Sequence, residues 1–211
     1  NSLFNHHRVS PPSLRSHKID RNLFLTRSFL NLSQDQDCKP QLPASQSALE
    51  SFDKLREGHP SSLVIVHPGT SRKGEIKRWF EDRYAAVINK VLETCDSSVV
   101  LLWGSSSEHL LVKKIKTLAG AAERVWIPDH RFSFPEILAL YERAACYLGV
   151  DSGPMHLANA VGLPVIALYG PKSLEIYRPY FEGAVVLSKN DEVGCAPCNA
   201  TRCHNPEGRV C

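Results

Sequence analysis

The hexamer Asp151-Ser152-Gly153-Pro154-Met155-His156 has the residue types of an anion-binding turn, because it joins a predicted strand to a predicted helix. The first N–H groups of a helix have no partner within it, and the helix dipole is positive there. Ser152 and Gly153 would let the chain turn tightly and let a phosphate approach the backbone. The alternative is an ordinary capped turn, with Asp151 or Ser152 as the N-cap.

A second loop of similar chemistry follows the apolar run 63–66. It reads His67-Pro68-Gly69-Thr70-Ser71-Arg72-Lys73-Gly74-Glu75-Ile76-Lys77-Arg78-Trp79. Hydroxyl and N–H donors beside a lysine charge are what a phosphate requires, whereas the alternative is a solvated basic turn before a helix. Open parallel sheets bind ligands at the carboxyl ends of their strands. Two such loops on one sheet therefore predict a shared phosphate site.

The elements that must position these loops alternate from Ser61 onward. The predicted strands are 63–66, 99–103, 125–127, 146–150 and 165–169, and the predicted helices are 81–94, 109–119, 134–145 and 155–161. Continuous apolar strands separated by helices are typical of a parallel sheet that is covered on both faces. The sequence therefore predicts an α/β, Rossmann-like fold, although it contains no Gly-x-Gly-x-x-Gly fingerprint.

The sequence predicts that the chain consists of three regions. Residues 1–60 predict helices without a strand: an amphipathic helix around Ile19 to Leu30, a polar connector over 34–43, and a helix that the capping box Ser47-Ala48-Leu49-Glu50 opens and Gly58 ends. We expect this region to be the helical tail of a preceding domain plus a linker. Residues 61–190 form the Rossmann-like domain, and residues 191–211 form a cysteine-rich tail.

Composition places few limits on function. The hydrophobic content of 43% and charged content of 22% are ordinary for a globular protein, and a net charge of +3 neither demands nor excludes nucleic acid. Basic residues near the start favour a solvated helix face over contact with an anionic membrane. No apolar run approaches the roughly 20 residues that span a bilayer. Met155 is the one methionine, so we expect a fragment of a longer protein.

With these motifs in this order, the chain resembles glycosyltransferase family 9, the heptosyltransferases that build the lipopolysaccharide inner core. The matching segments are residues 67–71, 77–79, 102–104 with Glu108, 151–160 and 168–171. The resemblance implies the GT-B arrangement, in which two Rossmann-like domains face each other across a cleft. It identifies residues 61–190 as the domain that binds the nucleotide-sugar donor and residues 1–60 as the end of the acceptor domain.

The resemblance also implies an activity. It is the inverting transfer of heptose from a nucleoside-diphosphate heptose, ADP-heptose above all, to a lipid-anchored saccharide through the missing domain. The expected location is the cytoplasm, with peripheral contact at the inner membrane as an open option. The family's general base is expected near the start of the acceptor domain, outside this chain. A catalytically inactive nucleotide-binding domain and a metal-binding or redox module remain the alternatives.

Roles for the diphosphate contacts follow from the resemblance. Thr70, Ser71 and Lys77 match contacts to the donor diphosphate, and Lys77 would neutralise the charge that develops on the departing nucleotide. Backbone N–H groups of Ser152 and Gly153 would also face the diphosphate. A surface lysine before a helix is the alternative for Lys77. The family implies no metal or other cofactor for this transfer, and we expect no nucleic-acid partner.

Three other side chains match positions around the sugar and the nucleoside. Asp151 would face the donor sugar hydroxyls or cap the helix, and His156 would hydrogen-bond the donor or pack inside. Glu108 resembles the acid that accepts hydrogen bonds from ribose hydroxyls, with a first-turn glutamate favoured by the helix dipole as its alternative. Phe132 would stack on the base or, more simply, belong to the core.

The tail contains four cysteines, Cys195, Cys198, Cys203 and Cys211, with His204 adjacent. Four such residues can bind zinc, ligate an iron–sulfur cluster, form disulfides or remain free thiols. A cytosolic location disfavours stable disulfides, and the spacing lacks the paired Cys-x2-Cys knuckles of typical zinc sites. Free thiols are therefore the expectation, and these four residues are the candidates for a structural metal.

Overall fold

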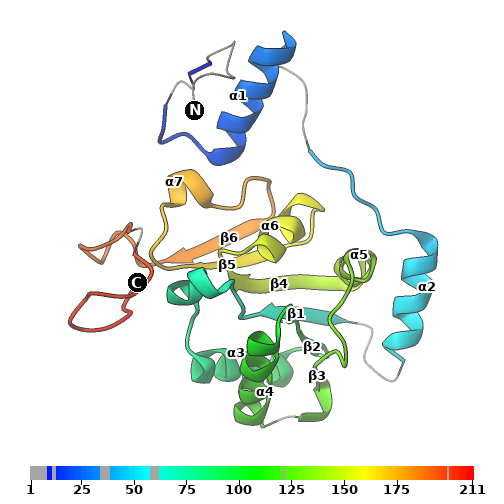
Figure 1. Ribbon diagram of the computed structural model, residues 1–211. Helices are drawn as coiled ribbons and strands as arrows, with labels where there is room; N and C mark the ends of the chain where they lie inside the picture. The colour runs from blue at the N-terminus through cyan, green and yellow to red at the C-terminus, as the bar shows by residue number, and fades with distance from the viewer. Residues whose placement is uncertain (1–8, 11–12, 34–38, 58–61, 121, 199) are drawn as a thin grey trace.

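A parallel six-stranded sheet forms the centre of the protein (Figure 1). The computed structural model describes residues 9–10, 13–33, 39–57, 62–120, 122–198 and 200–211. Its strands are β1 (Leu63–His67), β2 (Ser98–Leu101), β3 (Val125–Trp126), β4 (Ala144–Val150), β5 (Val165–Tyr169) and β6 (Ala184–Ser188). Their order is β3-β2-β1-β4-β5-β6, and each neighbouring pair is parallel. The predicted Rossmann-like fold is confirmed.

Helices cover both faces of the sheet. One face packs against α3 (Glu81–Thr94) and α4 (Ser106–Ala119), and the other packs against α2 (Gln46–Leu55), α5 (Phe134–Arg143) and α6 (Gly153–Ala160) (Figure 1). Successive strand residues point to opposite faces, so Ile65 joins the second layer and Val66 the first. The strands are therefore apolar on both sides, as a sheet covered on both faces requires.

Short helical segments lie in the connections between the strands and the main helices. These are the 3₁₀ helices η2 (Arg72–Lys77) and η3 (Ala122–Arg124) and the one-turn helix α7 (Leu174–Tyr177). The segment η2 directly follows the loop after β1, so it lies at the carboxyl edge of the sheet.

The two helices before the sheet differ in how they pack. The predicted amphipathic helix is α1 (Lys18–Leu30), but none of its residues is buried, and the preceding His17 contacts the Arg178 carbonyl at 2.8 Å. By contrast, α2 inserts Phe52 into the core and pairs Asp53 with Arg143 of α5 at 2.8 Å. The predicted boundary at residue 60 stays a prediction, although α2 packs as part of the Rossmann layer.

Helix starts were the least accurate local predictions. Ser45, rather than Ser47, caps α2, because its hydroxyl accepts a hydrogen bond from the Ala48 N–H at 3.2 Å. The predicted stop at Gly58 lies outside the described residues, and α2 ends at Leu55. Similarly, Ser105 caps α4, which begins at Ser106, three residues before the predicted start.

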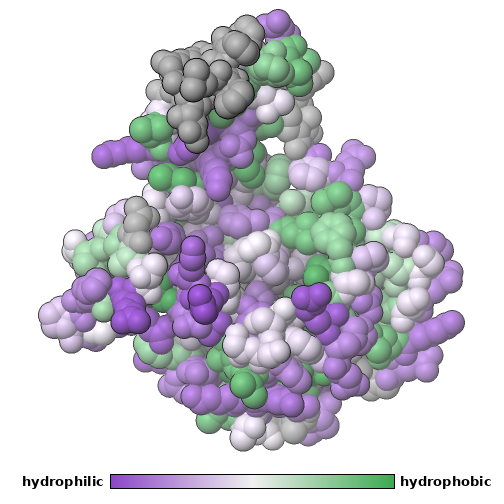
Figure 2. Space-filling model, in the orientation of Figure 1, coloured by the Kyte–Doolittle hydropathy of each residue, from purple (hydrophilic) through white to green (hydrophobic). Residues whose placement is uncertain are grey.

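The edge strand β6 was not predicted. It begins after Gly183, whose φ of +83° is a left-handed turn conformation, and its Val185 and Leu187 side chains are exposed. Exposed apolar residues are otherwise scattered among hydrophilic ones on the face in Figure 2. Across the described residues, no helix has the combined length and apolarity needed to cross a bilayer.

Candidate functional site

The candidate site lies where the strand order reverses. From β1 the chain winds outward through β2 and β3, then returns to place β4 on the other side of β1 and winds outward again. The loops that leave β1 and β4 therefore turn to opposite faces, and open α/β sheets bind ligands at the carboxyl ends of strands where the order reverses in this way. The loop after β1 leads into η2, and the loop after β4 leads into α6. These are the two loops that the sequence predicted to share a ligand.

An ion pair joins the two loops directly. The Lys77 ammonium lies 3.0 Å from Asp151 Oδ2 and donates to the Asp151 backbone carbonyl at 2.5 Å. Both side chains are mostly shielded from solvent, at 19% and 11% exposure. A pair at this depth is screened less by salt than a surface pair. The two predicted turns therefore meet at one edge of the sheet, with a lysine charge between them.

Asp151 also contacts the first turn of α6. Its Oδ1 lies 3.2 Å from His156 Nε2, so the carboxylate lies between an ammonium and an imidazole. Burial acts to raise the pKa of Asp151, but the His156 hydrogen bond and the Lys77 charge outweigh it and hold that pKa below 3.8. The carboxylate is therefore ionised at neutral pH and can fix the direction of both partners.

The hydroxyls of the loop after β1 differ in exposure. Thr70 is buried, and its Oγ1 has no hydrogen-bond partner among the described residues, whereas Ser71 is exposed and precedes η2. The Arg78 guanidinium donates to the Thr70 carbonyl at 3.1 Å and so holds η2 against this loop. An orphaned buried hydroxyl is uncommon in native proteins, so the Thr70 hydroxyl is a candidate contact for a bound group.

The start of α6 offers free backbone donors. Ser152 is the N-cap, but its side chain makes no capping hydrogen bond, and Pro154 follows in the first turn. Gly153 is exposed, and a methyl group at its Cα would meet nothing within 4 Å. Its φ is not positive, so the turn itself does not require glycine. The space in front of Gly153 is open to whatever approaches the helix start.

Glu108 lies at the same edge, between the loops that follow β1 and β2. The Gly104 N–H donates to its Oε2 at 2.7 Å, and a methyl group on Gly69 would lie 2.5 Å from its carboxyl carbon. The side chain is 7% exposed. Glu108 therefore packs against Gly69 of the loop after β1, and a side chain at position 69 would displace its carboxylate from this place.

Sequence reasoning missed two residues that shape this edge. Arg78 was noted only within a motif, yet it links η2 to Thr70. Tyr169 ends β5, its hydroxyl donates to the Tyr177 carbonyl, and burial together with the nearby Asp151 charge raises its pKa. Both contacts join residues only eight apart, but they depend on how the intervening loop folds back, which spacing along a chain does not reveal. Phe132 is a core residue, as the simpler interpretation held.

A cavity lies away from these two loops. It has a volume of about 470 Å³ beside α7, and it is lined by Arg15, Ser173, Glu175, Ile176, Tyr177, Pro197 and Cys198. None of the predicted donor contacts lines it, and Cys198 is the one metal candidate of the tail that does. The Lys77–Asp151 pair instead joins its own two loops, so a ligand that binds Lys77 must exchange hydrogen bonds with that pair.

The tail cysteines are free in this structure. Cys195, Cys198, Cys203 and Cys211 are unpaired thiols, and Cys195 and Cys203 are exposed. Within the described ranges, no three His, Cys, Asp or Glu side chains are grouped so that they could hold a metal ion. The four metal candidates therefore have no preformed ligand set in this arrangement, and the role of the thiols stays open.

His67, the last residue of β1, predicts a pH dependence of stability. It is buried just before the Thr70 loop, and burial, helped by repulsion from Arg78, lowers the pKa of His67 from 6.5 to about 4. Between these values the unfolded chain takes up a proton that the folded chain does not. We therefore expect the free energy of unfolding to fall by about 2 kcal/mol from pH 7 to pH 5.

Urea unfolding at the two pH values measures this loss. His67→Gln cannot titrate and should remove most of it, whereas His204→Gln, which changes an exposed histidine of the tail, should leave it intact. If the loss is equal in both variants, His67 is not its source.

Solved structures share this fold. A glycosyltransferase family 9 protein from Veillonella parvula aligns with a TM-score of 0.72 at 20% identity, over 87% of this chain and 52% of that one. The structure of E. coli heptosyltransferase WaaC with ADP aligns with a TM-score of 0.63 at 22% identity, over 86% of this chain and 53% of that one. The structure of WaaC with ADP-2-deoxy-2-fluoro heptose aligns with a TM-score of 0.58 at 23% identity, over 86% of this chain and 51% of that one. The chain is thus a Rossmann-like α/β protein of the kind found in GT-B heptosyltransferases.

The sequence comparison defines the family. The family described as glycosyltransferase family 9 (heptosyltransferase) matches residues 1–208, and the chain belongs to it. Lipopolysaccharide heptosyltransferase 3 of E. coli K12 is 29% identical over 188 residues, which are 81% of this chain and 48% of that protein. The chain therefore spans about half the length of this curated relative.

Proposed function

We propose that this chain is the donor-binding half of a heptosyltransferase that takes heptose from ADP-heptose and adds it to the lipopolysaccharide inner core. The observation that carries the proposal is the Lys77–Asp151 pair, which joins the loops after β1 and β4 at the point where the strand order reverses. Ligands of open α/β sheets bind at such points. The ADP and the ADP-2-deoxy-2-fluoro heptose of the E. coli WaaC structures support the choice of nucleotide and sugar.

In this proposal Lys77 is the catalytic residue. Transfer of the sugar leaves negative charge on the departing diphosphate, and a lysine held in a water-poor crevice stabilises that charge as it develops. Asp151 holds the Lys77 ammonium in position until the diphosphate replaces Asp151 as its partner. The lysine charge serves in place of a metal ion, so the proposal includes no metal or other cofactor.

The other site residues would hold the remaining parts of the donor. Thr70 and Ser71 would donate their hydroxyls to the diphosphate, as would the N–H groups of Ser152 and Gly153 at the start of α6. Glu108 would accept hydrogen bonds from the ribose hydroxyls. The unpartnered Thr70 hydroxyl and the open space at Gly153 support these roles.

Asp151 and His156 would face the heptose. A carboxylate repels a diphosphate, so Asp151 is expected to move toward the sugar hydroxyls when Lys77 exchanges it for phosphate. His156 already contacts Asp151 at 3.2 Å and would accompany it. Asp151 and His156 would then recognise the sugar hydroxyls, while Lys77 binds the negative charge of the diphosphate.

The remaining functions belong to the part of the protein beyond this chain. We propose that it binds the lipid-anchored saccharide acceptor and supplies the general base of an inverting transfer. The location would be cytoplasmic, at the inner face of the membrane that holds the acceptor. The chain's coverage of only 48% of its E. coli relative supports the need for a second half.

Calorimetric titration of the chain with ADP tests the proposal directly. We expect saturable binding, with weaker binding of UDP and GDP, and heptose transfer only after the missing half is supplied. If ADP binds and no transfer follows even then, the chain is an inactive nucleotide-binding domain. If ADP does not bind at all, the proposal fails.

Gly153→Ala separates binding from folding. The added methyl group meets nothing within 4 Å in this structure and lies in a helix, so stability should be unchanged or slightly higher. The same methyl group would occupy the approach to the first N–H groups of α6, so we expect ADP affinity to fall by about tenfold. Thermal unfolding and calorimetry measure the two effects, and unchanged affinity would place the diphosphate away from α6.

A further inference from the structure

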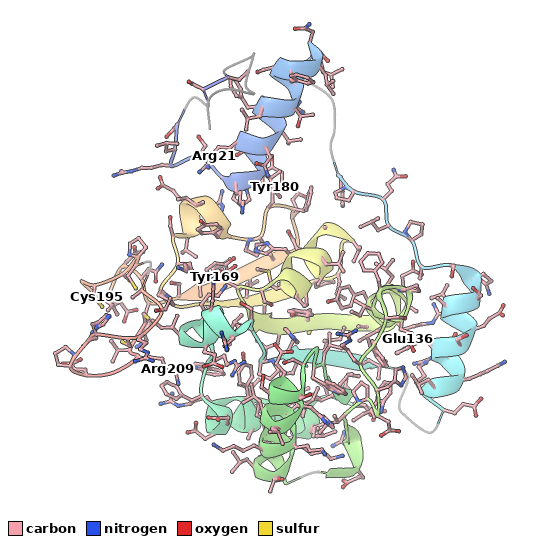
Figure 3. All side chains as sticks on the ribbon, in the orientation of Figure 1. Arg21, Glu136, Tyr169, Tyr180, Cys195 and Arg209 are labelled. Carbon is pink, nitrogen blue, oxygen red and sulfur yellow. The ribbon has the colours of Figure 1, made fainter. Side chains whose placement is uncertain are left out.

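The cysteine-rich tail (residues 191–211) returns to the edge of the sheet that carries the candidate site. Arg209 in this tail lies beside the β1 side of that edge, and Tyr169 marks the end of β5 (Figure 3). The Cys198 N–H donates to the Pro171 carbonyl at 2.6 Å, and Lys172 donates to the Cys198 carbonyl at 3.5 Å. The tail is thus tied at its start to the loop after β5.

The far end of the tail is tied to η2. One Arg209 nitrogen, Nη1, donates to the Arg78 carbonyl at 3.0 Å and to the Glu75 carbonyl at 3.3 Å. The guanidinium carbon also lies 4.9 Å from the centre of the Phe80 ring, a cation–π distance. In sequence, Lys77 lies between Glu75 and Arg78, whose carbonyls accept these hydrogen bonds. The Arg209 side chain therefore holds the backbone on both sides of Lys77.

The segment η2 has few other anchors. It is a six-residue 3₁₀ helix, a type with weaker hydrogen-bond geometry than an α-helix, and only Gly74 and Ile76 within it are buried. Arg78 fastens it to Thr70 from one side. Arg209 fastens it from the tail side, so the two arginines together set where the Lys77 backbone lies.

We propose that Arg209 is a positioning residue for Lys77, and that the tail serves as a strap that fixes the phosphate-facing lysine against Asp151. This inference rests on the proposed function for its consequence in binding, but its structural part stands independently. Arg209 acts on the Lys77 backbone and touches no predicted donor contact directly. Its loss should therefore matter only while Lys77 is present.

A double-mutant cycle tests this on the 211-residue chain. Arg209→Ala should weaken ADP binding about fivefold to tenfold, whereas in a Lys77→Ala background it should change binding less than about twofold. Arg202→Ala, which removes an exposed arginine of the same tail, should have no effect in either background. If Arg209→Ala weakens ADP binding equally in both backgrounds, Arg209 acts by its own charge and the proposal fails. If Arg209→Ala does not change ADP binding in the wild-type background, the proposal fails as well.

Hydrogen exchange provides a readout that does not depend on the nucleotide. The amides of Gly74 and Arg78 form hydrogen bonds within and at the end of η2, at 2.7 Å and 3.0 Å. Arg209→Ala should speed exchange over residues 72–78 while exchange in β1 and β4 stays the same, and Arg202→Ala should not. Unchanged exchange over 72–78 would overturn the strap. If Arg209→Ala gives the expected exchange result but the wild-type chain binds no ADP, only the proposed function fails.

Discussion

Replacing Lys77 by alanine in the full-length enzyme is expected to raise the barrier to heptose transfer by about 2–4 kcal/mol, which is a rate loss of roughly 30-fold to 1,000-fold. The reason is the placement of the Lys77 ammonium at 3.0 Å from Asp151, between the two loops that would hold the diphosphate. Without it, charge on the departing nucleotide develops beside a carboxylate. The turnover number at saturating donor measures the effect.

Two matched variants make the result specific. Lys73→Ala removes an exposed lysine from the same 3₁₀ helix and should leave turnover unchanged. Lys77→Arg keeps a positive charge and should fall between wild type and alanine. A normal turnover number for Lys77→Ala would remove this residue from the chemistry, whatever its effect on the donor's affinity.

Adding one methyl group to Gly69 is expected to cost about 3 kcal/mol of ADP binding, or roughly 100-fold in affinity. The methyl group would lie 2.5 Å from the Glu108 carboxyl carbon, so the flexible glutamate must swing away from the edge of the sheet. Its two proposed hydrogen bonds to ribose hydroxyls, each worth about 1.5 kcal/mol as charge-assisted bonds, are then lost.

The ribose itself supplies the control. Wild-type protein should bind ADP more tightly than 2′,3′-dideoxy-ADP by a similar factor, and Gly69→Ala and Glu108→Gln should both lose most of that preference. Gly194→Ala, in the tail with open space around it, should behave as wild type. If Gly69→Ala weakens both nucleotides equally, Glu108 does not contact the ribose.

The layered fold was predictable because its signals are local and repeated. The runs at 63–66 and 165–169 are apolar on both faces, and the boundaries of α3 and β5 match their predictions. Cap positions were harder, because Ser45 and Ser47 are equally good capping residues in sequence, and coordinates were needed to show that the Ser45 hydroxyl makes the capping hydrogen bond. The edge strand β6 was missed; none of its five residues is fully buried, and Val185 and Leu187 are exposed.

The candidate site was predictable as two turns at one edge of the sheet, but the contacts between them were not. Spacing indicated that Thr70 and Lys77 follow one strand and Asp151 another, and parallel topology brings such turns to one edge. The direct Lys77–Asp151 contact and the hold of Arg78 on Thr70 required coordinates. Arg209 lies 132 residues beyond Lys77, so no spacing rule connects the two (209 minus 77).

A crystal structure of this chain with ADP is the most direct test of where the nucleotide binds. It should place both phosphates between the Lys77 ammonium and the first N–H groups of α6, with the ribose hydroxyls on Glu108 and Asp151 released from the lysine. ADP bound instead in the cavity beside α7, with Lys77 still paired to Asp151, would contradict the assignment of this crevice as the donor site.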